Sequence, residues 1–140
     1  MQLAVTFAHA LADATRWRIV ELVLDQALCV CELADILDMP QSSVSSHLQV
    51  IRKAGLLESE RCEKWVYYRV SRKLRPLIDA LRKQLGVSTE TDSTLARDAR
   101  RAQKRLALRE QTCCPGPKTL ASKSQRVTQS QTLNPTPARS

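Results

Sequence analysis

The chain of 140 residues has few of the features that enzymes and membrane proteins need. It contains only three glycines, and no glycine-rich phosphate loop is present. No acid pair and no set of Ser, His and Asp stands at a catalytic spacing, so the sequence predicts no enzyme. No apolar run approaches the ~18 residues of a membrane-spanning helix. Because the first residues also lack a basic leader and a clear cleavage site, we expect a cytoplasmic protein without a membrane partner.

Positive charge is unevenly distributed along the chain. Residues 1–51 hold two basic and six acidic side chains, whereas residues 52–86 and 87–140 each hold ten basic and four acidic ones. The net charge therefore changes from −4 in the first segment to +6 in each of the other two. Such a split favours a polyanionic partner for the second part of the chain, with nucleic acid ahead of membrane. A merely basic and soluble surface is the alternative.

Composition divides the chain at Gly86. Residues 1–86 have dense hydrophobic periodicity and are expected to form one domain. Residues 87–114 include a further basic helix, expected over 92–110, and two adjacent cysteines, Cys113 and Cys114. Residues 115–140 are rich in Pro, Ser, Thr and Gln and have almost no large apolar side chains. We therefore expect this last segment to be a disordered tail.

Hydrophobic periodicity predicts five helices in the first domain, over residues 3–12, 14–24, 33–37, 41–55 and 72–86. Asp38-Met39-Pro40 should break the chain before the fourth of these helices, because the residue before proline disfavours helix. Residues 56–70 alternate and predict two strands joined near Glu63 and Lys64. This order predicts a mainly α fold with a small β-hairpin, that is, a winged helix-turn-helix.

The helix that follows the turn has two different faces. Its inner face is apolar and consists of Val44, Leu48 and Ile51. Its outer face has short hydrogen-bonding side chains and no acid, which suits a helix that enters a major groove. The outer residues are Ser42, Ser45, Ser46 and Gln49, followed by Arg52. Arg61 and Lys64 lie near the hairpin tip, where a wing would meet phosphates. A solvated serine face is the alternative interpretation.

Two stretches resemble parts of the ArsR/SmtB family of metalloregulatory repressors. "QSSVSSHLQVIRKAGLLESE" and "WVYYRV" are similar to the recognition helix and wing, and "ALCVCEL", residues 27–33, resembles the thiol box of the arsenic-responsive branch. The resemblance covers roughly residues 3–86 and implies a homodimer that covers double-stranded operator DNA until an inducer ion binds. It assigns inducer binding to Cys29 and Cys31. It assigns the operator contacts to the stretch that contains Gln41, Ser42, Ser43, Ser45, Ser46 and His47.

The spacing of Cys29 and Cys31 can be examined without the family. Trivalent arsenic or antimony prefers thiolate sulfur. Cysteines at i and i+2 point to one side of an extended backbone but project about 200° apart on a helix. We therefore expect the start of the short helix to hold the sulfurs apart in the DNA-bound form and to unwind when the ion binds. A helix N-terminus should also lower the pKa of these thiols. The alternative is that both cysteines are small packing residues.

The sequence departs from the family where further ligands would lie. Some members have a third cysteine at the position occupied here by Ala34. The last core helix has no histidine and offers only Asp79, which argues against a zinc, cobalt or nickel site. A third ligand must therefore come from Cys113, Cys114 or Cys62, or from a small thiol in solution. We expect Cys62 to be exposed on the wing and distant from the thiol box.

The sequence thus predicts a repressor that responds to arsenite or antimonite and uses no organic cofactor. It should bind operator DNA as a dimer and leave it when cysteine thiolates bind the ion. Two alternatives stay open. A redox-sensing repressor of the same fold would release DNA on mild oxidation alone. A thiol-based ion carrier would bind no promoter fragment.

Overall fold

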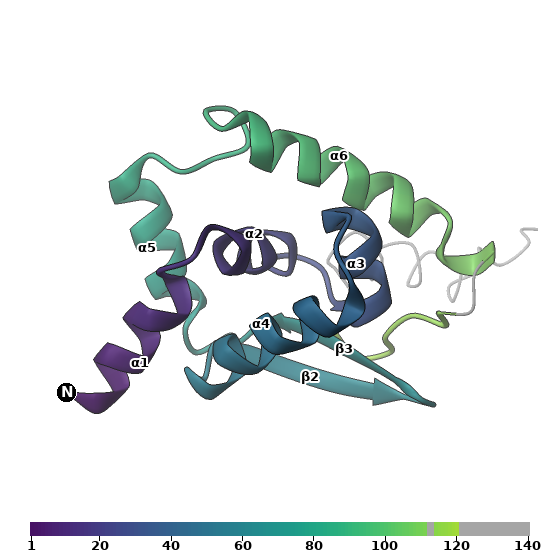
Figure 1. Ribbon diagram of the computed structural model, residues 1–140, viewed down its shortest axis with the longest axis horizontal. Coiled ribbons are helices and arrows are strands. Elements are labelled where there is room, and N and C mark those ends of the chain that lie inside the picture. Colours follow the sequence, from purple (N-terminus) through teal and green to yellow (C-terminus); the bar gives the residue numbers. More distant parts are fainter. Residues whose placement is uncertain (112–113, 121–140) are drawn as a thin grey trace, which may run out of the picture.

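A computed structural model describes residues 1–111 and 114–120 of the chain. Figure 1 shows helices around one small sheet, with α4 and the hairpin on one side of the molecule and α6 on the opposite side. Among the described residues, no helix is both long and apolar enough to cross a bilayer. In chain order the elements are α1 (Gln2–Leu11), α2 (Ala14–Leu22), β1 (Leu28–Cys29), α3 (Val30–Leu37), α4 (Gln41–Lys53), β2 (Leu57–Cys62), β3 (Trp65–Val70), α5 (Arg75–Leu85), α6 (Ser93–Ala107) and a 3-10 turn, η1 (Arg109–Gln111).

The pair α3 and α4 forms the predicted helix-turn-helix. α3 ends at Leu37, its C-cap Asp38 has a φ of 53° in the left-handed region, and Pro40 is the N-cap of α4. The apolar faces of the two helices meet in the main core. Their fully buried side chains are Leu33, Ile36, Val44, Leu48 and Ile51, with at most 3% of each exposed. Burial of each such side chain stabilises the fold by about 1.5–3 kcal/mol. Because Val44, Leu48 and Ile51 are all buried, the prediction of the inner face of α4 is confirmed.

The sheet has one strand more than the predicted hairpin. β2 and β3 pair in antiparallel register from Leu57–Val70 to Cys62–Trp65, and the short strand β1 adds to the other edge of β3. A two-residue strand has no alternating pattern by which the sequence could have revealed it. The order β1-β3-β2 places the thiol box beside the hairpin. The fold is a winged helix-turn-helix.

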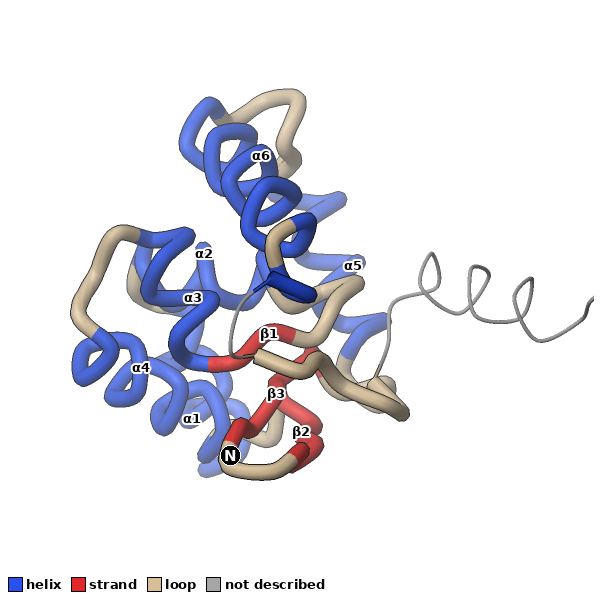
Figure 2. The backbone as a smooth tube through the Cα atoms, turned by 90° about the vertical axis from the view of Figure 1, so that its right-hand side faces the viewer, coloured by secondary structure: helices blue, strands red, loops and turns tan. Residues whose placement is uncertain are grey.

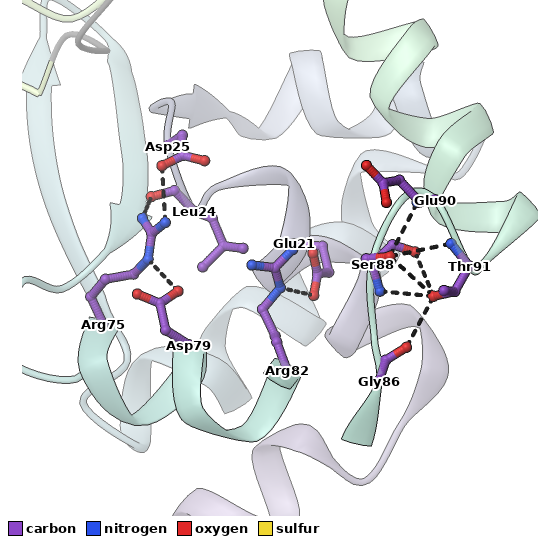
Figure 3. A network of polar contacts seen from close by, with 10 residues as sticks. All are labelled: Glu21, Leu24, Asp25, Arg75, Asp79, Arg82, Gly86, Ser88, Glu90 and Thr91. Atoms are coloured by element: carbon purple, nitrogen blue, oxygen red, sulfur yellow. Dashed lines mark hydrogen bonds and ion pairs between the residues drawn. The ribbon is translucent and has the colours of Figure 1, made fainter. Parts of the chain in front are cut away.

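Helices α1 and α5 lie at one end of the molecule (Figure 1) and keep apolar side chains in solvent. Leu3 and Leu85 have 73% and 63% of their surface exposed, and Val5 and Leu77 are exposed as well. Figure 3 shows what ties α5 to α2: the guanidinium of Arg82 donates to Glu21 at 2.8 Å, and Arg75 donates to the Leu24 carbonyl just after α2. Polar contacts and the buried Ile78 thus hold one side of α5, whereas Leu77 and Leu85 stay uncovered.

The helix expected over 92–110 packs on the core of the same chain. It forms α6, which Asp92 caps by accepting hydrogen bonds from the backbone of its first turn. Asp98, only 1% exposed, accepts two hydrogen bonds from Arg18 of α2 at 2.7 and 2.9 Å. This bidentate ion pair fixes α6 across α2 and α3, with η1 beside the thiol box. The sequence had not revealed this long-range pairing.

Candidate inducer site and DNA-binding face

Three cysteine sulfurs converge next to the start of α3. The Sγ atoms of Cys29 and Cys31 are 3.1 Å apart, and Cys114 Sγ lies 3.7 Å from the first and 3.2 Å from the second. All three cysteines are free thiols. Cys29 and Cys114 are each 1% exposed, and Cys31 is half-buried. Within residues 1–111 and 114–120, this trio is the one group of metal-ligating side chains compact enough to hold an ion.

The local backbone explains why the first two sulfurs meet. Cys29 is the N-cap of α3, with an extended conformation of φ −91° and ψ 171°, whereas Cys31 belongs to the first helical turn. The expectation that a helical start would separate the sulfurs is therefore wrong. It assumed that both cysteines lie on regular helix, but an N-cap residue has strand-like dihedrals. The sulfurs converge with the first turn intact, so no unwinding is needed.

Arg109 of η1 ties the C-terminal segment to this turn. The carboxylate of Glu32 accepts from the Cys29 N–H at 3.1 Å, which closes the capping box of α3. The same carboxylate, fully buried, accepts two hydrogen bonds from Arg109 at 2.8 Å each, and Arg109 also donates to the Ala27 carbonyl. The guanidinium lies 5.3 Å from the centre of the Tyr67 ring. A charged, bidentate pair thus joins the turn of Cys29 to the segment that leads to Cys114.

Arg105 of α6 brings a second positive charge to the site. It donates to Cys114 Sγ at 3.7 Å and to the Asp35 carboxylate at 2.9 Å. Its Nη1 is buried and finds no hydrogen-bond partner among the described residues, 3.9 Å from the Glu32 carboxylate. The two arginines therefore balance the two nearby acids, and the surroundings of the sulfurs are close to neutral.

Burial controls the protonation of Cys29 and Cys114. It raises the pKa of Cys29 far above its ordinary value, and the Glu32 carboxylate and Cys31 raise it further. Burial likewise raises the pKa of Cys114. The expected lowering by the helix N-terminus is outweighed, because loss of water and a nearby carboxylate both disfavour a thiolate. Cys29 and Cys114 are thus held in the protonated form, in which they are poor nucleophiles.

Three other residues were candidate ligands: Cys62, Cys113 and Asp79. Cys62 is half-buried and packs against the apolar cluster that contains Cys29 and Cys114, so the expectation that it is exposed and distant is wrong. Cys113 lies outside the described residues. Asp79 on α5 is ion-paired with Arg75 at 2.9 Å, so it is engaged in a structural contact.

The predicted DNA face lies on α4 and at the hairpin tip. Gln41, Ser42, Ser46, Gln49 and Arg52 are exposed, whereas Ser43, Ser45 and His47 are half-buried. Ser46 also donates to the Ser42 carbonyl at 3.0 Å, a local bond that leaves its oxygen able to accept. At the tip, Arg61 donates to the Glu63 carbonyl and Lys64 lies 4.9 Å from the Trp65 ring centre. The outer face of α4 and the two basic wing residues are thus available to a partner.

Comparison with known proteins agrees with this architecture. Residues 13–59 match the arsR family of bacterial regulatory proteins. The arsenic resistance transcriptional regulator ArsR1 of Pseudomonas putida is 40% identical over 92 residues, which span 65% of this chain and 70% of ArsR1. ArsR2 of the same organism is 32% identical over 109 residues, which span 75% of this chain and 92% of ArsR2. The chain belongs to the ArsR family.

A solved structure confirms the fold of this ArsR-family chain. The homodimeric winged helix-turn-helix DNA-binding domain of Mb0332 from Mycobacterium bovis superposes with a TM-score of 0.58. That match covers 61% of this chain and 80% of the domain, at 23% sequence identity, and supports the fold alone. Family and fold together make the protein a transcriptional repressor and not an enzyme, as the sequence had predicted.

Sequence reasoning missed the residues that organise the thiols of this ArsR-family protein. A signal existed for Glu32, because an acid three residues after an N-cap is typical of a capping box. Arg109 and Arg105 gave no such signal among the many basic residues of the C-terminal half. Their partners lie 77 and 70 residues away in sequence.

Proposed function

We propose that the protein represses transcription until trivalent arsenic or antimony binds Cys29, Cys31 and Cys114. The observation that carries this proposal is the convergence of three thiols within 3.7 Å of one another. Within the described part of the chain this group has three sulfurs and no fourth ligand, which suits the three-coordinate geometry of a trivalent, thiophilic ion. The names of the two Pseudomonas putida relatives, both arsenic resistance regulators, support the same inducer.

Charge balance favours arsenite over a divalent metal. Arsenous acid and three thiols form three As–S bonds, and each thiol proton leaves with one hydroxyl as water, so no oxidant or reductant is needed. The product is neutral, which suits a buried site whose two acids are already paired with Arg105 and Arg109. A divalent cation on three thiolates would leave one buried negative charge without a partner, which is costly. Glu32 cannot serve as a fourth ligand without giving up Arg109.

The DNA-binding state is proposed to be a dimer on an operator with two-fold symmetry. The exposed apolar residues of α1 and α5 supply a surface that a second copy would cover. Two α4 helices would then enter successive major grooves, with Arg61 and Lys64 of each wing on phosphates. Residues 1–86 would carry DNA binding and dimerisation, and the later segment would supply the third thiol.

The test uses the full-length reduced protein and a labelled DNA fragment from upstream of its own gene. Arsenite and antimonite are each expected to weaken DNA binding up to about 100-fold, within the range of allosteric coupling, and one arsenite should protect three thiols from alkylation. Zinc and peroxide should have little effect. Release by peroxide alone would favour the redox-sensing alternative, and absence of any DNA binding would favour the ion carrier. Sedimentation in reducing buffer should show a dimer.

A further inference from the structure

Three side chains stand in a row across the sheet, beginning at the thiol site. Cys29 of β1 is paired with Tyr67 of β3, and Tyr67 is paired in turn with Glu60 of β2. Side chains directly opposite one another on antiparallel strands project from the same face of a sheet. The row therefore leads from the candidate inducer site, through the central strand, to the hairpin that carries Arg61 and Lys64.

Residues 114–120, which we call the strap, contact this row one position at a time. Cys114 meets Cys29, the Gly116 N–H donates to Tyr67 Oη at 2.8 Å, and the Lys118 and Thr119 N–H groups donate to the Glu60 carboxylate at 2.5 and 2.6 Å. Figure 2 shows this segment in tan, after the grey gap, passing beside the strands. Successive parts of the strap thus engage β1, β3 and β2 in turn.

Two further features fit the strap to this path. Gly116 has φ +88°, and a Cβ at this position would lie 3.1 Å from the Arg109 side chain, so glycine is needed both for the backbone and for the close approach. Leu120, 9% exposed, packs in the same apolar cluster as Cys29, Tyr67 and Cys114. The strap is therefore anchored at both ends, by a thiol at the inducer site and by an apolar side chain beyond Glu60.

We infer that the strap transmits inducer binding to the wing, an inference that rests on the proposed function. An ion bonded to Cys114 as well as to Cys29 and Cys31 binds best when the strap is docked, so it favours the docked state over any state in which the strap has left the sheet. Docking holds β2 through Glu60, next to Arg61. In the ion-bound protein the strap thus holds the wing in place on the sheet. DNA binding requires the strap to release the wing. The ion lowers the affinity for DNA, and DNA lowers the affinity for the ion, by the same factor.

The decisive variant acts at the far end of the strap from the sulfurs. Glu60→Gln removes the charge that the Lys118 and Thr119 amides engage and leaves all cysteines in place. Glu63→Gln at the hairpin turn is the matched control, because it removes one acid from the same wing. The quantity compared is the factor by which arsenite weakens binding to the upstream DNA fragment. We expect Glu60→Gln to lower this factor at least threefold and Glu63→Gln to leave it unchanged.

A second pair tests the middle of the strap. Gly116→Ala should reduce the arsenite factor from about 100-fold to below about 10-fold, because the added Cβ meets Arg109. Gly86→Ala imposes the same kind of positive-φ strain, with φ +66°, but its Cβ would meet nothing within 4 Å, so it is the control. In the wild type, arsenite should also slow amide hydrogen exchange at Lys118 and Thr119. Thiol protection should show that each variant still binds the ion.

The outcomes separate the two proposals. If the wild type releases DNA with arsenite and both strap variants keep the wild-type factor, the strap inference is overturned and the proposed function stands. If arsenite fails to release the wild type, the proposed function fails and the inference fails with it. Should Gly116→Ala fold poorly by circular dichroism, the nearly isosteric change Glu60→Gln decides the question alone.

Discussion

The two halves of the thiol site are held in place by different means. Cys29 and Cys31 are fixed by the chain around them, because a strand-like N-cap followed by one helical turn brings their sulfurs to 3.1 Å. Cys114 comes from a segment more than 80 residues away and reaches them through Arg109, Tyr67 and Glu60. The local half is a stable part of the helix-turn-helix, whereas the distant half depends on contacts that can open. A site built from one fixed and one detachable half is suited to report ion binding.

The largest effect is expected from breaking the ion pair that joins the two halves. Arg109→Met leaves the buried Glu32 carboxylate without its main partner, so the free energy of unfolding should fall by about 3 kcal/mol. The double variant Arg109→Met with Glu32→Gln removes the uncompensated charge and should recover part of this loss. Urea unfolding of the reduced protein, followed by circular dichroism, measures both. A single variant as stable as the wild type would show that the pair does not hold the segment.

Removing either sulfur of the local half should abolish the response to the inducer. Cys29→Ser and Cys31→Ser each break the local pair and leave one fixed sulfur and Cys114, so no preformed pair remains to which a small thiol could add the third sulfur. We expect both variants to bind DNA as tightly as the wild type. Arsenite should no longer weaken their DNA binding, whereas it weakens that of the wild type by up to about two orders of magnitude. Anisotropy titrations with labelled upstream DNA, with and without arsenite, measure this change. A normal response in both variants would place the inducer site elsewhere.

Removing the sulfur of the distant half should weaken ion binding rather than abolish it, and it should also lower the factor by which arsenite weakens DNA binding, because the ion no longer bonds to the strap. Cys114→Ser leaves the fixed pair, to which a small thiol in solution can add the third sulfur. We expect arsenite to bind about tenfold more weakly, which corresponds to about 1.4 kcal/mol. Cys62→Ser is the control, because Cys62 lies nearby but outside the trio. Equal losses in the two variants would contradict the assignment of Cys114 as the third ligand. Cys113→Ser, compared with Cys114→Ser, tests which cysteine of the vicinal pair matters.

The same contrast explains what the sequence could reveal. Helices α2 to α4 and the β2–β3 hairpin follow from periodic apolar residues, and Cys29 and Cys31 follow from their spacing in a recognisable box. β1 was missed because two residues show no period. The position of Cys114 was left among several alternatives because it depends on Arg109 meeting Glu32, a contact across 77 residues. The error about the sulfurs arose from treating Cys29 as helical, although an N-cap residue is extended.

The smallest expected effect comes from removing the basic residues of the wing, and it tests whether their role differs from that of the contact between wing and strap. Arg61→Ala and Lys64→Ala remove proposed phosphate contacts, so each should weaken DNA binding several-fold for all sequences and reduce the salt slope by about one. Neither residue contacts the strap in any hydrogen bond found among the described residues. Arsenite should therefore weaken DNA binding by the same factor in these variants as in the wild type, although both affinities are lower. A salt series with and without arsenite measures both quantities. If either variant lost the arsenite factor, the basic wing residues themselves would transmit the response. The division of roles between Arg61 and Lys64, which contact DNA, and Glu60, which the strap binds, would then be wrong.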